Sequence, residues 1–242
     1  MLTVAACSSS PQTRHVDTLL VGDSILYEAK AVTRHALGSH TVVIHAVPGS
    51  APCDMLDWFD ATGRGFRARL VVIETMGSVR TPCSMASGLP DTAAARHRTA
   101  RDIERLAAAA RRTGARVLIV DPLPVGAMTV AGNAWLDALT QDLHRDLAGR
   151  RGISFTDGPR RSVAPDGRFV VAAACRSAAE PGCVDGQVTL RDPYFGVHLC
   201  PKTYVDDAAI RRGCPVASPG ASRFGQALAV AVERAEAHRS RS

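Results

Sequence analysis

Short runs of consecutive apolar residues alternate along the chain with longer segments whose apolar residues recur every three or four positions. The short runs are bounded by Gly, Pro or Asp, as expected of strands that are buried on both faces of a parallel sheet. They predict strands at residues 19–21, 41–46, 70–73, 116–121 and 153–155. The longer segments predict amphipathic helices over residues 24–37, 92–112, 133–147 and 222–237.

The order of these segments predicts the fold class. Strand and helix segments alternate, with no Pro- or Gly-rich linker between two halves, which is typical of a parallel sheet covered by helices on both faces. We therefore expect an α/β fold, a three-layer α/β/α sandwich on a central, mostly parallel five-stranded sheet. Residues 157–191 show no clear periodicity and are expected to be irregular.

Composition and charge argue against some partners. The 242 residues are 46% hydrophobic and carry a net charge of +6, which arises mainly from arginines spread along the chain. A nucleic acid-binding surface would gather basic residues and interleave aromatic ones, and the sequence has no such stripe. No apolar run approaches the about 20 residues that span a bilayer. We expect a globular monomer with no nucleic-acid partner.

The N-terminus contains a candidate lipidation site. The small residues Val4, Ala5 and Ala6 precede Cys7, and a Ser-rich stretch follows it, as in a bacterial lipobox. The charged and apolar parts of a signal peptide do not precede this stretch, so they lie upstream or have been removed. The alternative is a frayed N-terminus with an incidental cysteine. We expect a lipobox-like tether over residues 1–15, a single domain over residues 16–242, and no membrane contact beyond a lipid on Cys7.

Six further cysteines form an even set, which fits disulfides and an oxidising compartment. Six cysteines permit 15 pairings. Because each would join neighbouring loops, we favour Cys53–Cys83, Cys175–Cys183 and Cys200–Cys214. No Cys-x-x-Cys or His-Cys pair has the spacing of metal ligands, so no metal site is expected. The cysteines and the lipobox together predict an extracytoplasmic protein, either secreted or anchored by lipid.

Ser24 is the first candidate for chemistry. It follows the buried residues 19–21 and a Gly22-Asp23 turn, and so stands at the carboxyl end of a strand and the start of a helix. Ligands bind at this edge of open α/β sheets, and the N–H groups of a helix start favour negative charge. The hydroxyl becomes a nucleophile only if a base reaches it. Otherwise Ser24 is simply a helix cap.

Four sequence blocks together resemble the SGNH/GDSL hydrolase superfamily. They are Gly22-Asp23-Ser24, Gly49 after the second strand, Gly77-Ser78 after the third, and Gly196-Val197-His198-Leu199 near the end. Their order and spacing cover nearly the whole chain. The Thr-Pro-Cys stretch after the third block and the His-Leu-Cys-Pro stretch at the fourth resemble the secreted, cysteine-bearing branch of actinobacterial type.

The resemblance implies a role for each matching residue. Ser24 would be the nucleophile and His198 its general base, and no cofactor would be needed. The N–H groups of Ser24 and Gly49 would donate to the oxyanion of the tetrahedral intermediate. Ser78 occupies the position of the family's asparagine, the remaining oxyanion donor, and has a shorter reach.

The base block departs from the family at its acid. The family carries an aspartate three residues before the histidine, where this chain has Phe195. Asp192, three residues further back, would replace it if the turn brings the carboxylate to His198. The other possibility is a Ser-His dyad with a backbone carbonyl orienting the ring. Either arrangement predicts a slower enzyme.

Two functions remain open on these grounds. The first is an SGNH-type serine esterase or deacylase that hydrolyses, or transfers, an acyl ester on a cell-envelope glycan, a lipid or a small molecule. The second is a catalytically degenerate lipoprotein of the same fold that binds or scaffolds. Ser24 with His198 favours the enzyme, whereas Phe195 and Ser78 favour the binding protein.

Overall fold

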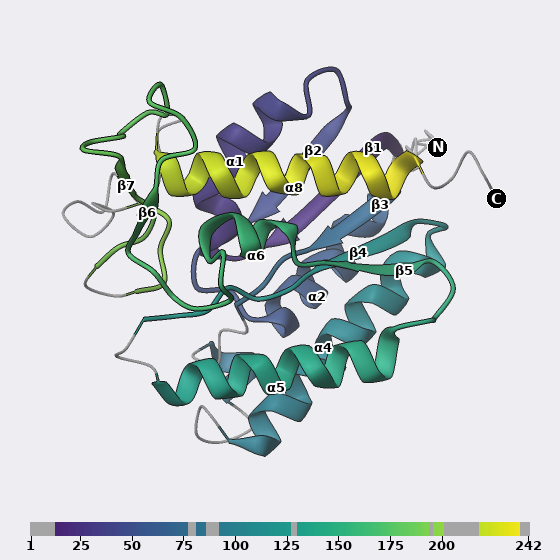
Figure 1. Ribbon diagram of the computed structural model, residues 1–242. Helices are drawn as coiled ribbons and strands as arrows, with labels where there is room; N and C mark the ends of the chain where they lie inside the picture. Colours follow the sequence, from purple (N-terminus) through teal and green to yellow (C-terminus); the bar gives the residue numbers. More distant parts are fainter. Residues whose placement is uncertain are drawn as a thin grey trace, which may run out of the picture.

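The computed structural model describes residues 13–76, 81–85, 92–126, 130–193, 196–200 and 218–237. Its centre is a five-stranded sheet with strand order β2-β1-β3-β4-β5 (Figure 1). The strands are β1 (Arg14–Gly22), β2 (Val42–Ala46), β3 (Phe66–Ile73), β4 (Arg116–Val120) and β5 (Ile153–Thr156). All neighbouring strands of this sheet are parallel. The predicted α/β fold is therefore confirmed.

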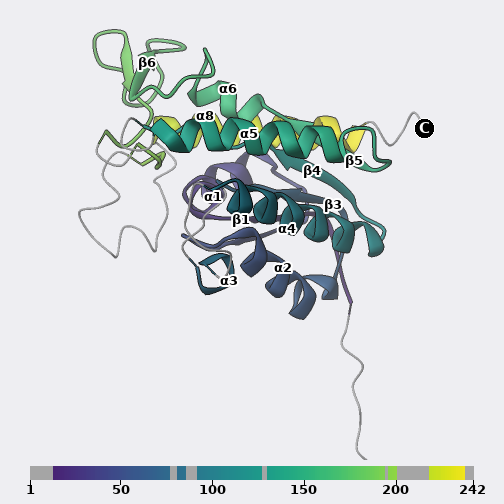
Figure 2. The same cartoon turned by 90° about the horizontal axis from the view of Figure 1, so that it is seen from below.

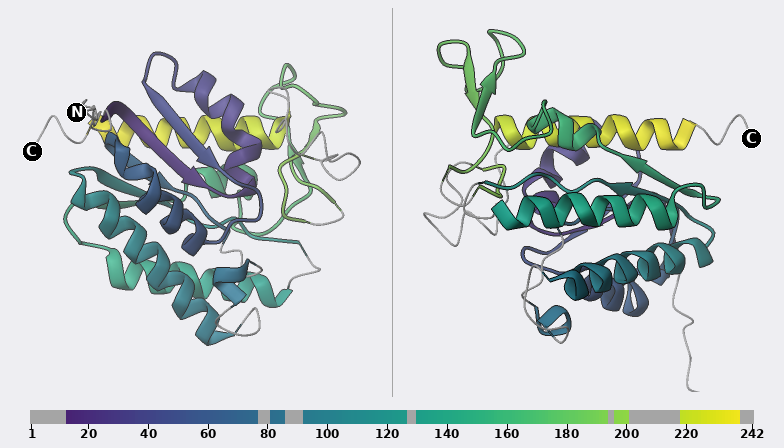
Figure 3. Two further views of the ribbon diagram at one scale, coloured as in Figure 1. Left: turned by 180° about the vertical axis from the view of Figure 1, so that it is seen from behind. Right: turned by 60° about the horizontal axis from the view of Figure 1, so that its bottom comes forward.

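Helices cover both faces of the sheet (Figures 2 and 3). One face packs against α2 (Pro52–Ala61), α4 (Ala93–Arg112) and α5 (Val130–Leu147). The other face packs against α1 (Ser24–Ala36), α6 (Gly158–Val163) and α8 (Pro219–Ala237). In the left panel of Figure 3, α2 and α4 lie in front of the sheet and α8 behind it. None of the described helices is long and apolar enough to cross a bilayer.

The apolar runs supply one core on each side of the sheet. In β1, Leu19 and Val21 point into the core under α2, α4 and α5, whereas Leu20 points into the core under α1 and α8. Because successive side chains of a strand face opposite ways, a strand with helices on both faces must be apolar at every position. This requirement explains why the strands are visible in the sequence.

The segment that was expected to be irregular contains local structure. It holds α6 and a separate antiparallel sheet of β6 (Ala172–Ala174) and β7 (Gln187–Thr189). Each of these strands has three residues, which is too short for a period-two pattern to emerge. Two further short pieces complete the described elements, a 3₁₀ turn at Gly63–Gly65 and α3 (Pro82–Met85).

Two of the three predicted disulfides are confirmed. Cys53–Cys83 joins α2 to α3, and Cys175–Cys183 closes the loop between β6 and β7. Cys200 is also disulfide-bonded, but its predicted partner Cys214 lies outside the described residues. Cys53, Asp54 and Cys83 lie close enough together to suggest a metal site. The two sulfurs are bonded to each other, however, so they are not available as thiolate ligands.

Candidate active site

The turn between β1 and α1 presents Ser24 at the carboxyl edge of the sheet. Asp23 caps the helix, and its Oδ1 accepts a hydrogen bond of 3.0 Å from the N–H of Ile25. Ser24 is half-buried in the first turn. Gly22 is required at the end of the strand, because an added Cβ would lie 2.7 Å from the Leu26 side chain. The turn therefore leaves no room for a side chain at position 22 and places Ser24 at the first position of the helix.

His198 lies against the same helix, on the face that carries Ser24. Its Nδ1 is hydrogen-bonded to Oε1 of Glu28, while Oε2 of Glu28 accepts a bond of 2.6 Å from the N–H of Leu199. Glu28 follows Ser24 by four residues, and residues with that spacing are neighbours on one helix face. Among the described residues, Ser24 and His198 make no hydrogen bond with each other. Glu28 and His198 are thus in contact on α1, and the helix spacing puts Ser24 on the same side of that helix.

The carboxylate at Nδ1 is one that the sequence analysis missed. Asp192, the acid considered for this role, contacts His198 through the main chain, where its N–H donates to the His198 carbonyl at 2.9 Å. Asp192 was predicted to contact the imidazole ring of His198, but Glu28 makes that contact instead. An acid one helical turn after the candidate nucleophile was a usable signal in the sequence. The family pattern, by contrast, points to residues just before the histidine.

A buried arginine contacts the segment that carries His198. Arg191 is fully buried, and its Nη2 donates to the carbonyl of Val197 at 2.5 Å and to that of Gly196 at 3.3 Å. Burial lowers the pKa of Arg191 to about 10, against the opposing effect of the Glu28 charge. Arg191 therefore ties down the segment that carries His198 and provides a positive charge near Glu28, which is itself buried.

The residues expected around an oxyanion are described only in part. Gly49 follows β2 with a φ of +78°, a conformation that favours glycine. The N–H of Val47 donates to the carbonyl of Gly22 at 3.0 Å, so the Gly49 loop begins beside the nucleophile turn. Ser78 lies outside the described residues.

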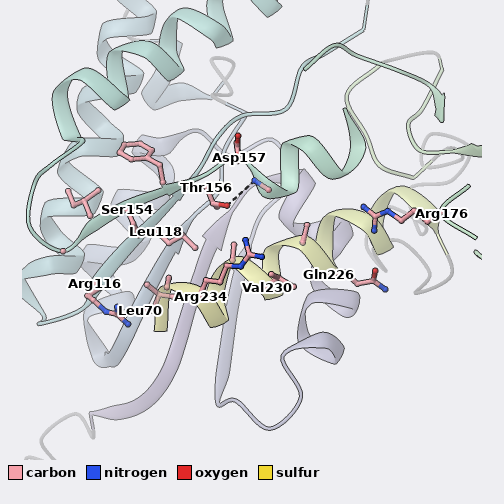
Figure 4. Close-up of a pocket in the computed structure, with 17 residues that line it drawn as sticks. Leu70, Arg116, Leu118, Ser154, Thr156, Asp157, Arg176, Gln226, Val230 and Arg234 are labelled. Carbon is pink, nitrogen blue, oxygen red and sulfur yellow. Dashed lines mark hydrogen bonds between the residues drawn. The ribbon is translucent and has the colours of Figure 1, made fainter. Parts of the chain in front are cut away.

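A separate groove opens on the α8 side of the sheet. It has a volume of about 810 Å³ and runs between α8 and strands β4 and β5 (Figure 4). Figure 4 shows Arg234 on α8 and Arg116 on β4 at the end of the groove, with Thr156 and Asp157 across from Arg234. Neither Ser24 nor any other predicted catalytic residue lines it. The groove is therefore separate from the predicted catalytic residues.

The chain is similar to several solved structures along most of its length. A GDSL-like lipase from Bacteroides thetaiotaomicron VPI-5482 has 14% identity and a TM-score of 0.57, over 96% of this chain and 93% of the lipase. A proposed acylhydrolase from Bacteroides fragilis NCTC 9343 has 16% identity and a TM-score of 0.56, over 90% of this chain and 86% of that one.

The catalytic domain of peptidoglycan O-acetyltransferase A from Streptococcus pneumoniae has 15% identity and a TM-score of 0.49, over 93% of this chain and 96% of that domain. No protein-family model matches the sequence, and no curated protein matches it. At these identities the likeness concerns the fold. The chain has the fold of the SGNH/GDSL hydrolases, as the sequence blocks around Ser24 and His198 predict.

Proposed function

We propose that this protein is a serine esterase or deacylase in which Ser24 is the nucleophile, His198 the general base and Glu28 the acid that orients the base. The observation that carries the proposal is the contact between Glu28 and Nδ1 of His198, on the helix face that also bears Ser24. With Nδ1 donating to a carboxylate, Nε2 is left unprotonated and able to accept a proton.

The reaction would proceed through an acyl-enzyme. Ser24 Oγ attacks the ester carbonyl while Nε2 of His198 takes its proton, and Glu28 stabilises the imidazolium. The N–H groups of Ser24 and Gly49 donate to the oxyanion, and the alcohol leaves with the proton from His198. Water, activated by the same base, then hydrolyses the acyl-enzyme. A sugar hydroxyl in place of water would give acyl transfer instead.

Ser78 in place of an asparagine sets an expectation for the rate. Loss of one oxyanion donor costs on the order of 10²–10³ in turnover. We therefore expect a slower enzyme than a relative that keeps the amide. Asp192 is not needed as the orienting acid in this mechanism, since Glu28 takes that role.

We also propose that the protein works outside the cytoplasm. Two disulfides support this location, because such bonds persist mainly in oxidising compartments. Lipidation at Cys7 would anchor the domain to a membrane through the residues before β1, which begins at Arg14 and so makes the tether shorter than the predicted 1–15. The substrate class proposed is an acyl ester on an envelope glycan, a lipid or a small molecule.

A binding or scaffolding protein on the same fold is the second candidate. Phe195 and Ser78 at the family's acid and amide positions favour it, as does the lack of a Ser24–His198 hydrogen bond among the described residues. In that case the Glu28–His198 contact would only fasten the chain to α1.

Labelling with a fluorophosphonate probe separates the two functions. Wild type and Ser24→Ala would be compared at about pH 7.5, where an ordinary histidine is mostly neutral, with p-nitrophenyl acetate hydrolysis measured alongside. Ser162→Ala, on α6, is the matched control that removes a different serine hydroxyl. We expect labelling and turnover in wild type and Ser162→Ala, and neither in Ser24→Ala. A folded wild type that is not labelled would refute the esterase and leave the binding protein.

A further inference from the structure

Glu74 has no part in the reaction described above, although it lies against the nucleophile turn. It directly follows β3 and is 2% exposed, as is Asp23. Oε2 of Glu74 accepts hydrogen bonds from the N–H groups of Asp23 at 3.4 Å and Leu26 at 3.3 Å. Asp23 accepts from the N–H groups of Ile25 at 3.0 Å and Met76 at 2.6 Å. Both carboxyl groups thus accept from N–H groups of the same turn, and the N–H of Asp23 itself donates to Glu74.

These two side chains account for the open donors at the start of α1. The first N–H groups of a helix have no partner inside the helix. Asp23 takes the N–H of Ile25, and Glu74 takes that of Leu26. Within the described part of the chain, the N–H of Ser24 makes no hydrogen bond. The carboxyl pair thus accepts from the N–H groups before and after Ser24. The N–H of Ser24, which an oxyanion would need, is left for the substrate.

Two carboxyl groups buried this close together are not both ionised at neutral pH. Burial raises the pKa of Asp23 to about 6, although hydrogen bonds from the Met76 and Ile25 N–H groups oppose the rise. Burial and the neighbouring Asp23 charge raise the pKa of Glu74 well above its usual value. One proton therefore stays with the pair.

Within the part of the chain that the structure describes, few other charges act on this pair. The charges of His198 and Glu28 act on Asp23 from the base segment and from α1. On the flanking strand β2, His45 stacks on Trp58 of α2, with ring centroids 3.7 Å apart. Beyond β4, Asp121 pairs with His144 of α5 at 2.9 Å. Those groups are engaged with helices on the other face of the sheet.

We propose that Asp23 and Glu74 share one proton beneath the nucleophile turn. In this arrangement Glu74 is a positioning residue that keeps the Ser24 N–H aligned. The shared proton also means that the oxyanion does not face a second negative charge. The proposal rests on the function proposed above. Loss of the shared proton would leave two carboxylates that repel each other and the oxyanion. A unit charge about 7 Å away, at an effective dielectric constant of about 20, slows oxyanion formation roughly 50-fold.

The pH profile of kcat/KM tests the catalytic part. Glu74→Gln imitates the protonated acid, because its amide can donate to Asp23 and accept from Leu26, whereas Glu74→Ala does neither. Glu104→Gln, on α4 across the sheet, is the matched control for loss of a carboxylate. With p-nitrophenyl acetate as substrate, the kcat/KM of wild type and of Glu104→Gln should fall roughly 50-fold as the pH rises to the alkaline side of the profile. The kcat/KM of Glu74→Gln should not show this fall. Glu74→Ala should lose at least about tenfold in kcat at every pH.

Two results would overturn this proposal. One is an alkaline fall in Glu74→Gln equal to that of wild type, and the other is a Glu74→Ala variant within twofold of wild type. Both require an active wild type, so they are distinct from failure of the proposed function, in which wild type itself turns over nothing.

Unfolding free energy gives a readout that needs no activity. The folded-state pKa values of the pair lie above their unfolded values, so the pair stabilises the fold at low pH. That contribution is lost as the pH rises from about 4.5 through the folded-state pKa values. Urea titrations should show this loss in Ser24→Ala and in Glu104→Gln, and a much smaller loss in Glu74→Gln. Equal losses in all variants would mean that no proton is shared.

Discussion

Replacing Glu28 by Gln tests the proposed triad directly, because the sequence and the structure point to different acids. Glutamine keeps the size of the side chain, and its carbonyl oxygen can still accept the Leu199 N–H, which now lies 2.6 Å from Oε2. Its amide would face Nδ1 of His198 as a donor. The ring proton would then reside on Nε2, the nitrogen that must be free to act as a base.

The expected magnitude follows from the charge that is removed. The base becomes a cation in the transition state, and a carboxylate about 4 Å away, at an effective dielectric constant of about 20, stabilises that cation by about 4 kcal/mol. This energy corresponds to about 10³ in rate. The loss should appear in kcat, since the imidazolium forms only during the reaction.

The assay compares wild type, Glu28→Gln and Asp192→Asn in p-nitrophenyl acetate hydrolysis, with urea denaturation to confirm folding. Asp192→Asn is the matched control, because it neutralises the buried acid nearest in sequence to the base. We expect Glu28→Gln to lose about 10³ in kcat and Asp192→Asn to lose less than about tenfold. A Glu28→Gln enzyme within tenfold of wild type, beside an Asp192→Asn enzyme that is nearly inactive, would refute the assignment of Glu28.

Three predictions concern stability. Glu180 pairs with the buried Arg223 through contacts of 2.7 and 2.8 Å, so Glu180→Gln should cost about 3 kcal/mol in urea unfolding. Because this pairing lowers the pKa of Glu180 to about 2, the contribution should be full above about pH 4.5 and lost as the pH falls toward 2; a cost that does not change between pH 5 and pH 2.5 would contradict it. Replacing Cys53 and Cys83 by Ser opens a loop with a sequence separation of 30 and should cost about 3.5 kcal/mol, whereas an unchanged free energy would argue against the bridge. Gly22→Ala would put a Cβ 2.7 Å from a neighbouring side chain and should cost about 1–3 kcal/mol; a neutral effect in the same titration would show that the turn can relax.

The central sheet could be predicted from the sequence because each of its strands has a local signal, a short run of apolar residues. Strands between two helical layers must be apolar throughout, and runs such as residues 70–73 are too short and too branched to suggest helices. The small β6–β7 sheet gave no such signal. It is held by contacts distant in sequence, above all the bonds from Arg223 on α8 to Glu180 and to the carbonyl of Ala174.

The parts of the candidate site that lie in short sequence blocks could be predicted from the sequence. Ser24 and His198 stand in recognisable blocks, and the structure brings their elements together through Glu28. Within α1, Glu28 is one of several polar residues of an amphipathic helix, so the sequence pattern does not set it apart. Only the tertiary position of the base segment, 170 residues away in sequence, distinguishes it from the other polar residues of that helix.

The location of Glu28 has a consequence for how this site can change during evolution or design. In this mechanism, two of the three reacting side chains are carried by a single rigid helix, at positions fixed by its pitch. Only the imidazole comes from another part of the chain. The three side chains are therefore aligned once the loop that carries His198 packs against α1. Position 195 is then released from supplying a carboxylate and is open to selection for other properties. A designer could transfer the nucleophile and its acid to another scaffold as one five-residue segment, Ser24–Glu28, and optimise the histidine loop separately.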